Sequence, residues 1–271
     1  MRQFLAEKEL DSTGCLKVEG KKARYLTNVL RVQAGDMIYV RLLSDQLVQM
    51  TVSLVEKAEK YVLLQLAGDE GAAVPASMAK APPLDKKNDV NIYLFQFIAK
   101  PVKMELIIRQ AAECGVSAII PVEGDFCQKG PLESARKHCQ EGDDRWQKII
   151  AEARQQSGSP VDTRVLSCLP VEKAVDLWQN QCGTGLVLYE RTEKTQPLHR
   201  IIWENRSKKN YGLFVGAEGG ISPREIDLLC KGGLFPVHFA TNILRCETAA
   251  VYGLAALQSA LMEKDLWQFK E

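Results

Sequence analysis

The chain has 271 residues, of which 46% are hydrophobic and 25% charged, and these are ordinary values for a globular protein of one or two domains. The composition argues against a disordered, collagen-like or coiled-coil protein. Lys and Arg total 35 against 34 Asp and Glu, so any nucleic-acid binding must come from local basic patches.

Neither end of the chain predicts a membrane or export segment. Residues 1–8 include an early Glu and no apolar stretch, which does not fit a secretory signal. The longest apolar stretch, 249–262, is shorter than the roughly 20 residues of a membrane span and predicts a buried helix. The eight cysteines form no CxxC pair, so we expect free thiols in the reducing cytoplasm and no metal site.

The first part of the chain, residues 1–72, predicts a small β-barrel domain. Short apolar runs separated by Gly and Asp indicate strands at 37–42, 48–52 and 61–66, and a helix is expected at 21–30. The next segment, 73–89, is rich in Pro and Ala without periodicity and predicts a linker.

From residue 90 onward, strand and helix patterns alternate, which predicts an α/β domain over 90–271 with a largely parallel sheet. Strands are expected at 90–98, 118–122, 185–189, 211–215 and 235–240. Helices are expected at 103–114, 145–156, 223–229 and 247–262. Ligands of such sheets bind beyond the carboxyl ends of the strands.

The segment after the strand at 211–215 carries a candidate ligand loop. Gly216-Ala217-Glu218-Gly219-Gly220 precedes Ser222, Pro223 and Glu225, which predict an N-cap, a first helical residue and a capping box. Glycines let backbone approach a ligand, and the Glu218 carboxylate can accept hydrogen bonds from ribose or amine groups. A tight turn without ligand is the alternative, and the spacing fits neither dinucleotide nor P-loop patterns.

A second loop of the same kind follows the strand at 235–240. Here Asn242-Ile243-Leu244-Arg245 leads into a helix that begins near Glu247. A weak local ion pair between Arg245 and Glu247 is the plain interpretation. Two such loops so close in the sequence favour one shared pocket.

Two segments carry basic residues that could contact RNA. Between residues 17 and 31 five basic residues face one acidic residue, a local charge of +4. Near residue 100 a strand meets a helix, and lysines there could neutralise phosphates. Solvated surface charge is the alternative in both places. The candidate RNA-binding residues are Lys21, Lys22, Arg24, Arg31, Lys100 and Lys103.

Five stretches together make the chain similar to the RsmE family of bacterial 16S ribosomal RNA (uridine-N3) methyltransferases, in the SPOUT superfamily. They are 25–36, 100–116, 145–157, 215–220 and 243–249. The last two resemble the family's GPEGG and ILR.ETA loops and are the most specific, because they occur together, in order, near the end of the chain.

The resemblance implies a PUA-like β-barrel that binds RNA, followed by a SPOUT α/β domain with a deep trefoil knot. It also implies a cytoplasmic homodimer that acts on 16S ribosomal RNA or the small ribosomal subunit, with S-adenosyl-L-methionine (SAM) as cofactor and without membrane or metal. The residues expected around SAM are Tyr189, Glu190, Gly216, Ala217, Glu218, Gly219, Gly220, Asn242, Ile243, Leu244 and Thr248.

The chain departs from the family at four places. Ala217 replaces the proline of GPEGG, and Ala240 or Thr241 stands where a glycine is usual. Residues 123–127 replace a basic turn, and Gly158-Ser159-Pro160 replaces an arginine. The last two departures remove RNA-facing charge, so they affect the RNA target more than the chemistry.

The chemistry that the resemblance implies is methyl transfer to an imide nitrogen. Uridine N3 is a poor nucleophile while protonated, so we expect Arg245 to stabilise negative charge on the uracil oxygens. Glu218 or Glu247 is expected to orient groups or relay the proton. N3 lies on the Watson–Crick edge, so the base must be unpaired to react.

Other functions stay open at this point. The fold could belong to a SPOUT methyltransferase that modifies another RNA position or a ribose, or to an RNA-binding protein without catalysis. A Rossmann-type dehydrogenase is less favoured, because no glycine fingerprint follows an early strand.

Overall fold

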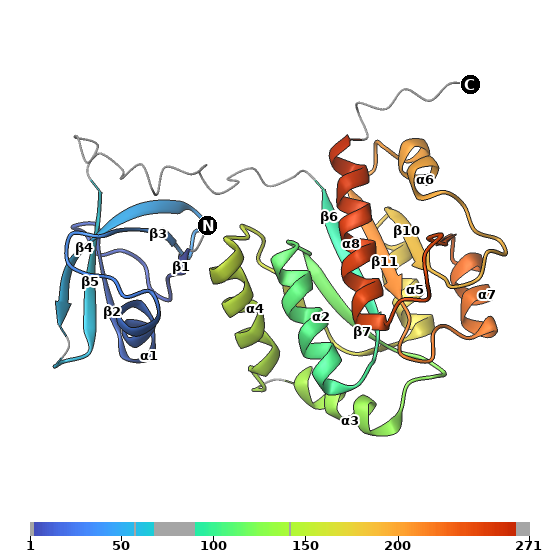
Figure 1. Ribbon diagram of the computed structural model, residues 1–271, viewed down its shortest axis with the longest axis horizontal. Coiled ribbons are helices and arrows are strands. Elements are labelled where there is room, and N and C mark those ends of the chain that lie inside the picture. The colour runs from blue at the N-terminus through green and yellow to red at the C-terminus, as the bar shows by residue number, and fades with distance from the viewer. Residues whose placement is uncertain (1–2, 57, 68–89, 141, 264–271) are drawn as a thin grey trace. The chain divides into compact units, whose positions relative to one another are not determined.

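The computed structural model describes residues 3–56, 58–67, 90–140 and 142–263 (Figure 1). The chain forms two compact units. Among the described residues, the N-terminal unit contains those up to 67 together with 154–160, and the C-terminal unit contains 90–153 and 161 onward. The sequence pattern did not indicate that 154–160 would pack with the first unit. The linker expected at 73–89 lies outside the described residues.

The N-terminal unit is built on a five-stranded sheet in the order β1-β3-β4-β5-β2. The strands are β1 (Phe4–Leu5), β2 (Cys15–Glu19), β3 (Met37–Arg41), β4 (Leu47–Glu56) and β5 (Tyr61–Leu66). β1 runs parallel to β3, and the other pairs are antiparallel. Val52 faces Leu64 across the β4–β5 pair, and both are fully buried, so alternate residues of each strand form the core.

One helical segment packs on this sheet and contains a change of helix type. The helix α1 (Gly20–Arg24) continues into the π-helix η1 (Tyr25–Val29), where the sequence predicts one ordinary helix. Ala23 and Leu26 are buried against the sheet, which leaves Lys21 and Arg24 exposed.

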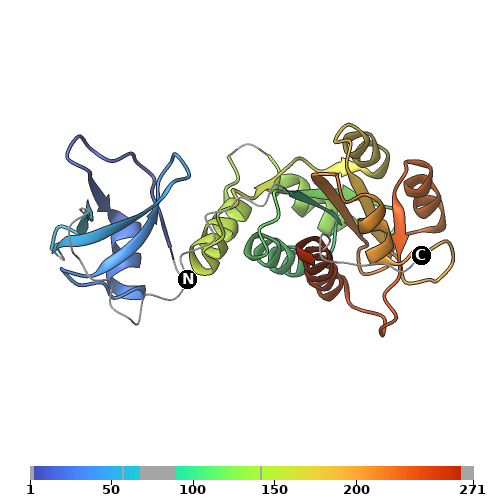
Figure 2. The ribbon, with the colours of Figure 1, turned by 90° about the horizontal axis from the view of Figure 1, so that it is seen from above.

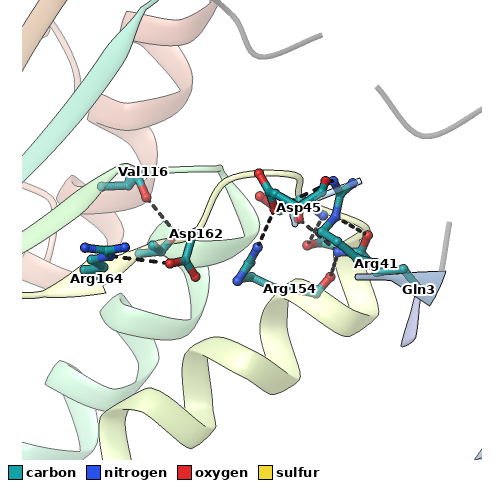
Figure 3. Close-up of polar contacts among 10 residues, drawn as sticks. Gln3, Arg41, Asp45, Val116, Arg154, Asp162 and Arg164 are labelled. Atoms are coloured by element: carbon teal, nitrogen blue, oxygen red, sulfur yellow. Dashed lines mark hydrogen bonds and ion pairs between the residues drawn. The ribbon is translucent and has the colours of Figure 1, made fainter. Parts of the chain in front are cut away.

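A polar network within the N-terminal unit explains why 154–160 belong to it (Figure 3). The side-chain amide of Gln3 donates to the carbonyls of Arg154 and Ser159 at 3.1 and 2.9 Å. The guanidinium of Arg41 donates to Gln3 Oε1 at 3.0 Å and to the carbonyl of Asp45 at 2.7 Å. The two bonds donated by Gln3 are buried and join segments that lie 151 and 156 residues apart in the sequence.

The C-terminal unit contains a seven-stranded sheet in which every pairing is parallel, in the order β12-β10-β11-β6-β7-β8, with β9 also paired to β7. The strands are β6 (Asn91–Phe97), β7 (Ala118–Glu123), β8 (Arg164–Val165), β9 (Leu169–Pro170), β10 (Thr184–Leu188), β11 (Asn210–Val215) and β12 (Phe235–Val237). The helices are α2 (Pro101–Glu113), α3 (Lys129–His138), α4 (Arg145–Ser157), α5 (Val171–Gln179), α6 (Leu198–Glu204), α7 (Pro223–Lys231) and α8 (Cys246–Glu263). The expected alternation of strands and helices is confirmed.

Two hydrophobic cores cover the two faces of this sheet. Residues of α2, α6 and α8 pack on one face, where Leu213 of β11 points, and residues of α5 and α7 pack on the other, where Phe214 points. Figure 2 shows α8 beside α2 on one side of the sheet. Gly253 lets α8 lie close against the sheet, because a Cβ atom at this position would lie 2.6 Å from Cδ1 of Leu188 in β10.

A side-chain bond and an ion pair fix the chain where it enters β8. Thr163 Oγ1 donates to the carbonyl of Val116 at 2.6 Å, and Arg164 pairs with Asp162 at 3.4 Å (Figure 3). Within the described ranges, no helix has the length and apolarity needed to cross a bilayer, and no group of three His, Cys, Asp or Glu side chains is arranged to hold a metal ion.

Candidate active site

A cavity of about 360 Å³ lies beyond the carboxyl ends of β10, β11 and β12. Because these strands are parallel neighbours, the loops that follow them meet at one edge of the sheet. The residues around the cavity are Lys103, Leu188, Tyr189, Glu190, 215–221, 237–239, 241–246 and Ala249.

The loop after β11 is a tight turn that requires glycine. The N–H of Gly220 donates to the carbonyl of Ala217 at 3.0 Å, and Gly220 has a φ of +78°, which favours glycine. A Cβ atom on Gly216 would lie 2.8 Å from the carbonyl carbon of Gly220. The turn therefore presents backbone, and not side chains, to the cavity along most of its length.

The start of α7 holds this turn in place. Ser222 caps the helix and Glu225 completes the capping box, as the sequence predicts. Glu225 is fully buried and also accepts a hydrogen bond of 2.7 Å from the N–H of Asp125, in the loop after β7. The Asp125 carboxylate accepts from Ser222 Oγ at 2.6 Å and pairs with Arg224 at 2.7 Å. Of the two carboxylates in the loop that departs from the family pattern, Asp125 is thus paired with Arg224, and Glu123 is paired with Arg136 of α3 at 2.6 Å.

The loop after β12 forms the opposite wall of the cavity. The strand ends at Val237, earlier than the expected 240, and His238 hydrogen bonds through Nδ1 to the carbonyl of Tyr189 at 3.1 Å. The helix α8 begins at Cys246, and the carbonyl of Arg245 accepts the bond from Ala249 N at 2.7 Å. The Arg245 side chain is exposed and forms no ion pair with any described residue.

Lys103 of α2 joins the two loops. Its ammonium lies 3.0 Å from Glu247 Oε2 and 3.7 Å from Glu218 Oε1, and all three side chains are less than one third exposed. Glu218 Oε1 also accepts a hydrogen bond of 3.2 Å from the backbone N–H of Lys100. The expected local pair between Arg245 and Glu247 is replaced by this longer-range pair, which leaves the Arg245 guanidinium available for a ligand.

The cluster shifts the pKa values of its members in directions that follow from charge and burial. The hydrogen bond to Glu247 raises the pKa of Lys103, which therefore stays protonated. Burial acts to raise the pKa of Glu247, but hydrogen bonds from its own backbone, Lys103 and Cys246 outweigh it and lower the pKa below its ordinary value. Burial and the bond to Glu247 raise the pKa of the Cys246 thiol to about 12.

The structure brings most of the predicted site residues together. Of the residues expected around SAM, all but Thr248 line the cavity. Of the expected catalytic residues, Arg245 and Glu218 line it, and Glu247 reaches it only through Lys103.

The six basic residues predicted to bind RNA divide into three groups. Lys103 lines the cavity and pairs with carboxylates, whereas Lys100 is exposed and contributes a backbone N–H. The others, Lys21, Lys22, Arg24 and Arg31, belong to the N-terminal unit.

Sequence reasoning missed several lining residues. Leu188, His238 and Phe239 lie at the ends of β10 and β12, so the parallel arrangement itself was the signal that could have found them. Cys246 and Ala249 belong to the first turn of α8, which faces the cavity.

A cavity at the carboxyl edge of a parallel sheet, with apolar walls and two carboxylates, is typical of an α/β protein that binds a small ligand. Residues 86–258 match the model of the RNA methyltransferase domain family, and the chain belongs to this family. The enzyme class predicted from the sequence motifs is thereby confirmed.

Named relatives are similar over almost the whole chain. Ribosomal RNA small subunit methyltransferase E of Bacillus subtilis is 24% identical over 96% of this chain and 97% of its own. Ribosomal RNA small subunit methyltransferase E 2 of Borreliella burgdorferi is 28% identical over 90% of each chain.

A solved structure shares the fold. The crystal structure of ribosomal RNA small subunit methyltransferase E from Neisseria gonorrhoeae, bound to S-adenosyl methionine, matches with a TM-score of 0.75 and 24% identity, over 96% of this chain and 97% of that one.

Proposed function

We propose that this protein uses SAM to methylate N3 of a specific uridine in bacterial 16S ribosomal RNA, in the cytoplasm. The membership of the RNA methyltransferase family supports the reaction type, and the names of the relatives support the ribosomal substrate. The observation that carries the proposal is the cavity in which the loops 216–221 and 241–246 meet.

The residues around the cavity fit SAM, which combines an adenine, a ribose, a sulfonium and an amino acid. Leu188, Phe239 and Leu244 offer apolar surface to the adenine, and the backbone of the 216–220 turn allows close approach. The carboxylates of Glu190 and Glu218 suit ribose hydroxyls or positive charge. When bound, SAM supplies an electrophilic methyl group.

Three side chains have separate roles in the proposed methyl transfer. Arg245 at the cavity stabilises negative charge on the uracil oxygens as N3 loses its proton. Glu218, which lines the cavity, accepts that proton and passes it to solvent. Glu247 is a positioning residue, because it contacts Lys103 and does not line the cavity. Alignment of N3 with the methyl group lowers the activation barrier further.

The finer fold assignment belongs to the same proposal. We assign a PUA-like RNA-binding barrel to 1–72, a linker to 73–89 and a SPOUT domain to 90–271, of which 154–160 pack with the N-terminal unit. The two loops at the cavity and α8 would form the deep trefoil knot, with Thr248 supporting the cofactor from the helix.

We also propose a homodimer that uses exposed apolar residues near the cavity. Val102, Ile243 and Tyr252 are 81%, 87% and 42% exposed, although each is hydrophobic. Val102 and Tyr252 belong to α2 and α8, which pack side by side. Burial of these residues against a second copy would complete the site around Ile243.

The experiment that tests the function is nucleoside-resolved mass spectrometry of small-subunit RNA treated with the protein and SAM. We expect N3-methyluridine at one position, and none with SAM omitted. Methylation of a ribose or another base would contradict the uridine-N3 assignment. A protein that binds RNA but shows no heat of SAM binding in calorimetry would be a non-catalytic member of the fold.

A further inference from the structure

The N-terminal unit contains a second cavity of about 320 Å³. It lies between the helical segment α1–η1 and the turn that joins β4 to β5. The residues around it that matter here are Arg24, Thr27, Asn28, Glu56, Lys60 and Tyr61. Within the described residues it is built from this unit alone.

The backbone around this cavity has unusual conformations on both sides. On one side Thr27 and Asn28 belong to the π-helix η1, and single π-helical turns are frequent at functional sites. On the other side Lys60 has a φ of +56°, in the left-handed region that a lysine seldom adopts. The carbonyl of Lys60 accepts a bond of 3.2 Å from Gly20 N, which fixes the turn to the start of α1.

The cavity offers hydrogen-bonding groups that the protein leaves available. Asn28 Oδ1 accepts a weak bond of 3.3 Å from Thr27 Oγ1, while its amide NH₂ donates to no described residue. Glu56 Oε1 accepts from Ala58 N at 3.1 Å, and its second oxygen has no described partner. An amide and a carboxylate can match the donor and acceptor pattern on the edge of a nucleobase.

Tyr61 supplies an aromatic ring beside these polar groups. The Tyr61 side chain is half-buried, and the Lys17 ammonium lies 4.6 Å from the centroid of its ring. Aromatic side chains of this kind stack on the bases of single-stranded nucleic acids.

Three lysines of the N-terminal unit are held in ion pairs, whereas the two cations at the cavity are not. Lys8 and Lys17 pair with Glu19 at 3.3 and 2.9 Å, and Lys22 lies 3.5 Å from Glu7. Arg24 and Lys60, by contrast, are exposed and form no ion pair with any described residue. Exposed, unpaired cations beside a polar cavity suit phosphate groups.

We propose that this cavity binds one unpaired nucleotide of the RNA, with the base at Asn28 and Tyr61 and the adjoining phosphates at Arg24 and Lys60. The proposal rests on the proposed function and deepens it. It gives the N-terminal unit a base-reading site in addition to a basic surface. Such a site would hold a nucleotide other than the one that is methylated.

The test compares two fluorescent probes on the full chain without SAM: a uridylate hexamer, and a hexamer of abasic ribose phosphates with the same charge. We expect Asn28→Ala to weaken binding of the uridylate hexamer about 5- to 10-fold, and Tyr61→Ala at least as much. Neither substitution should change binding of the abasic hexamer. Asn28 is exposed, so its replacement leaves the core intact.

Lys21→Ala is the matched control, because Lys21 is exposed on the same helix but does not line the cavity. We expect it to weaken both hexamers equally, through phosphates alone. If Asn28→Ala also weakened both equally, or changed neither, the base-binding site would be refuted. Because these measurements need no SAM, a wild-type protein without methyl transfer activity would refute the proposed function and leave this test unaffected.

Discussion

The two cavities use their charges in opposite ways. At the C-terminal cavity, Lys103 pairs with both Glu218 and Glu247, and each of the three side chains is less than one third exposed. At the N-terminal cavity, Arg24 and Lys60 are exposed and have no ion pair in the described part of the chain. Half-buried pairs hold groups in fixed positions, whereas exposed cations attract phosphates over a distance and are screened by salt. The first region should therefore respond to changes of geometry and pH, and the second to ionic strength.

The largest loss of activity is expected from a substitution of Arg245. This cation of the C-terminal cavity has no ion pair with the described residues, unlike Lys103. Arg245→Ala should lower methyl transfer roughly 100- to 1,000-fold, because it removes the group that stabilises charge on the uracil oxygens. SAM affinity, measured by calorimetry, should stay near the wild-type value. Arg200→Ala is the control, since Arg200 does not line the cavity and its guanidinium lies 2.8 Å from the Glu204 carboxylate. Wild-type kinetics for Arg245→Ala would exclude this residue from the mechanism.

A smaller loss of activity is expected when the ion pairs of Lys103 with Glu218 and Glu247 are removed. Lys103→Met should lower kcat about 10- to 100-fold, because Glu247 and Glu218 lose the cation that positions them. The pKa of Glu247 should rise, since burial then acts without the opposing hydrogen bond from Lys103. The acid limb of the pH–rate profile should accordingly move to higher pH.

Lys103→Arg serves as the conservative variant for that experiment. It keeps the positive charge, so it should restore most of the kcat and return the acid limb toward its original position. A decrease in kcat with an unchanged pH profile would show that Lys103 supports the fold and does not tune the site.

Much of the C-terminal site could be predicted from sequence, and the reason is local. Residues 216–220 and 242–245 directly follow apolar strand patterns, so their position at the sheet edge follows from the parallel topology. Lys103 could be named as a candidate but not placed, because its partners Glu218 and Glu247 lie more than 100 residues away in the chain. Pairing across that distance depends on how α2 packs, which periodicity does not specify.

The N-terminal unit was harder to predict for the same physical reason. Its strands at β3, β4 and β5 follow the alternation of apolar residues, and they were predicted. The Gln3 bonds to Arg154 and Ser159 join segments that no local pattern connects. The π-helix η1 has no composition of its own, and the second cavity depends on it together with the conformation of Lys60.

The salt dependence of RNA binding tests the exposed cations of the N-terminal unit. The double substitution Lys21→Ala with Arg24→Ala should weaken RNA binding about 5- to 10-fold at low salt. It should also reduce the slope of log affinity against log salt by roughly 2, one for each lost phosphate contact. Fluorescence anisotropy over a salt series measures both. Lys8→Ala, which removes a cation already paired with Glu19, should change the slope less. An unchanged slope for the double variant would contradict a phosphate-binding surface.

The smallest effect is expected at Asp125, which supports the turn of the C-terminal cavity. Hydrogen bonds from Arg224 and then Ser222 hold the pKa of Asp125 below its ordinary value of 3.8. The folded protein therefore binds this proton less readily than the unfolded chain, and the stabilisation is complete above pH 3.8 and lost as the pH falls through the lower, folded value. Asp125→Asn should lower the free energy of unfolding by about 0.5–1 kcal/mol at neutral pH, a value that allows for solvent screening of a partly exposed pair.

Urea unfolding from pH 7 to pH 3 measures this difference. The difference should shrink as the pH falls below about 3.8, because the unfolded wild-type chain then binds the Asp125 proton more readily than the folded protein does. Asp227→Asn is the matched control, because Asp227 lies on α7, as Arg224 does, and its pair with Lys194 at 3.0 Å is more exposed at both ends than the Asp125–Arg224 pair. Its effect should stay under about 0.5 kcal/mol. Equal effects of the two substitutions at every pH would mean that the Asp125 network adds nothing beyond an ordinary surface pair, and the turn at 216–220 would then depend on its own backbone and on Glu225 alone.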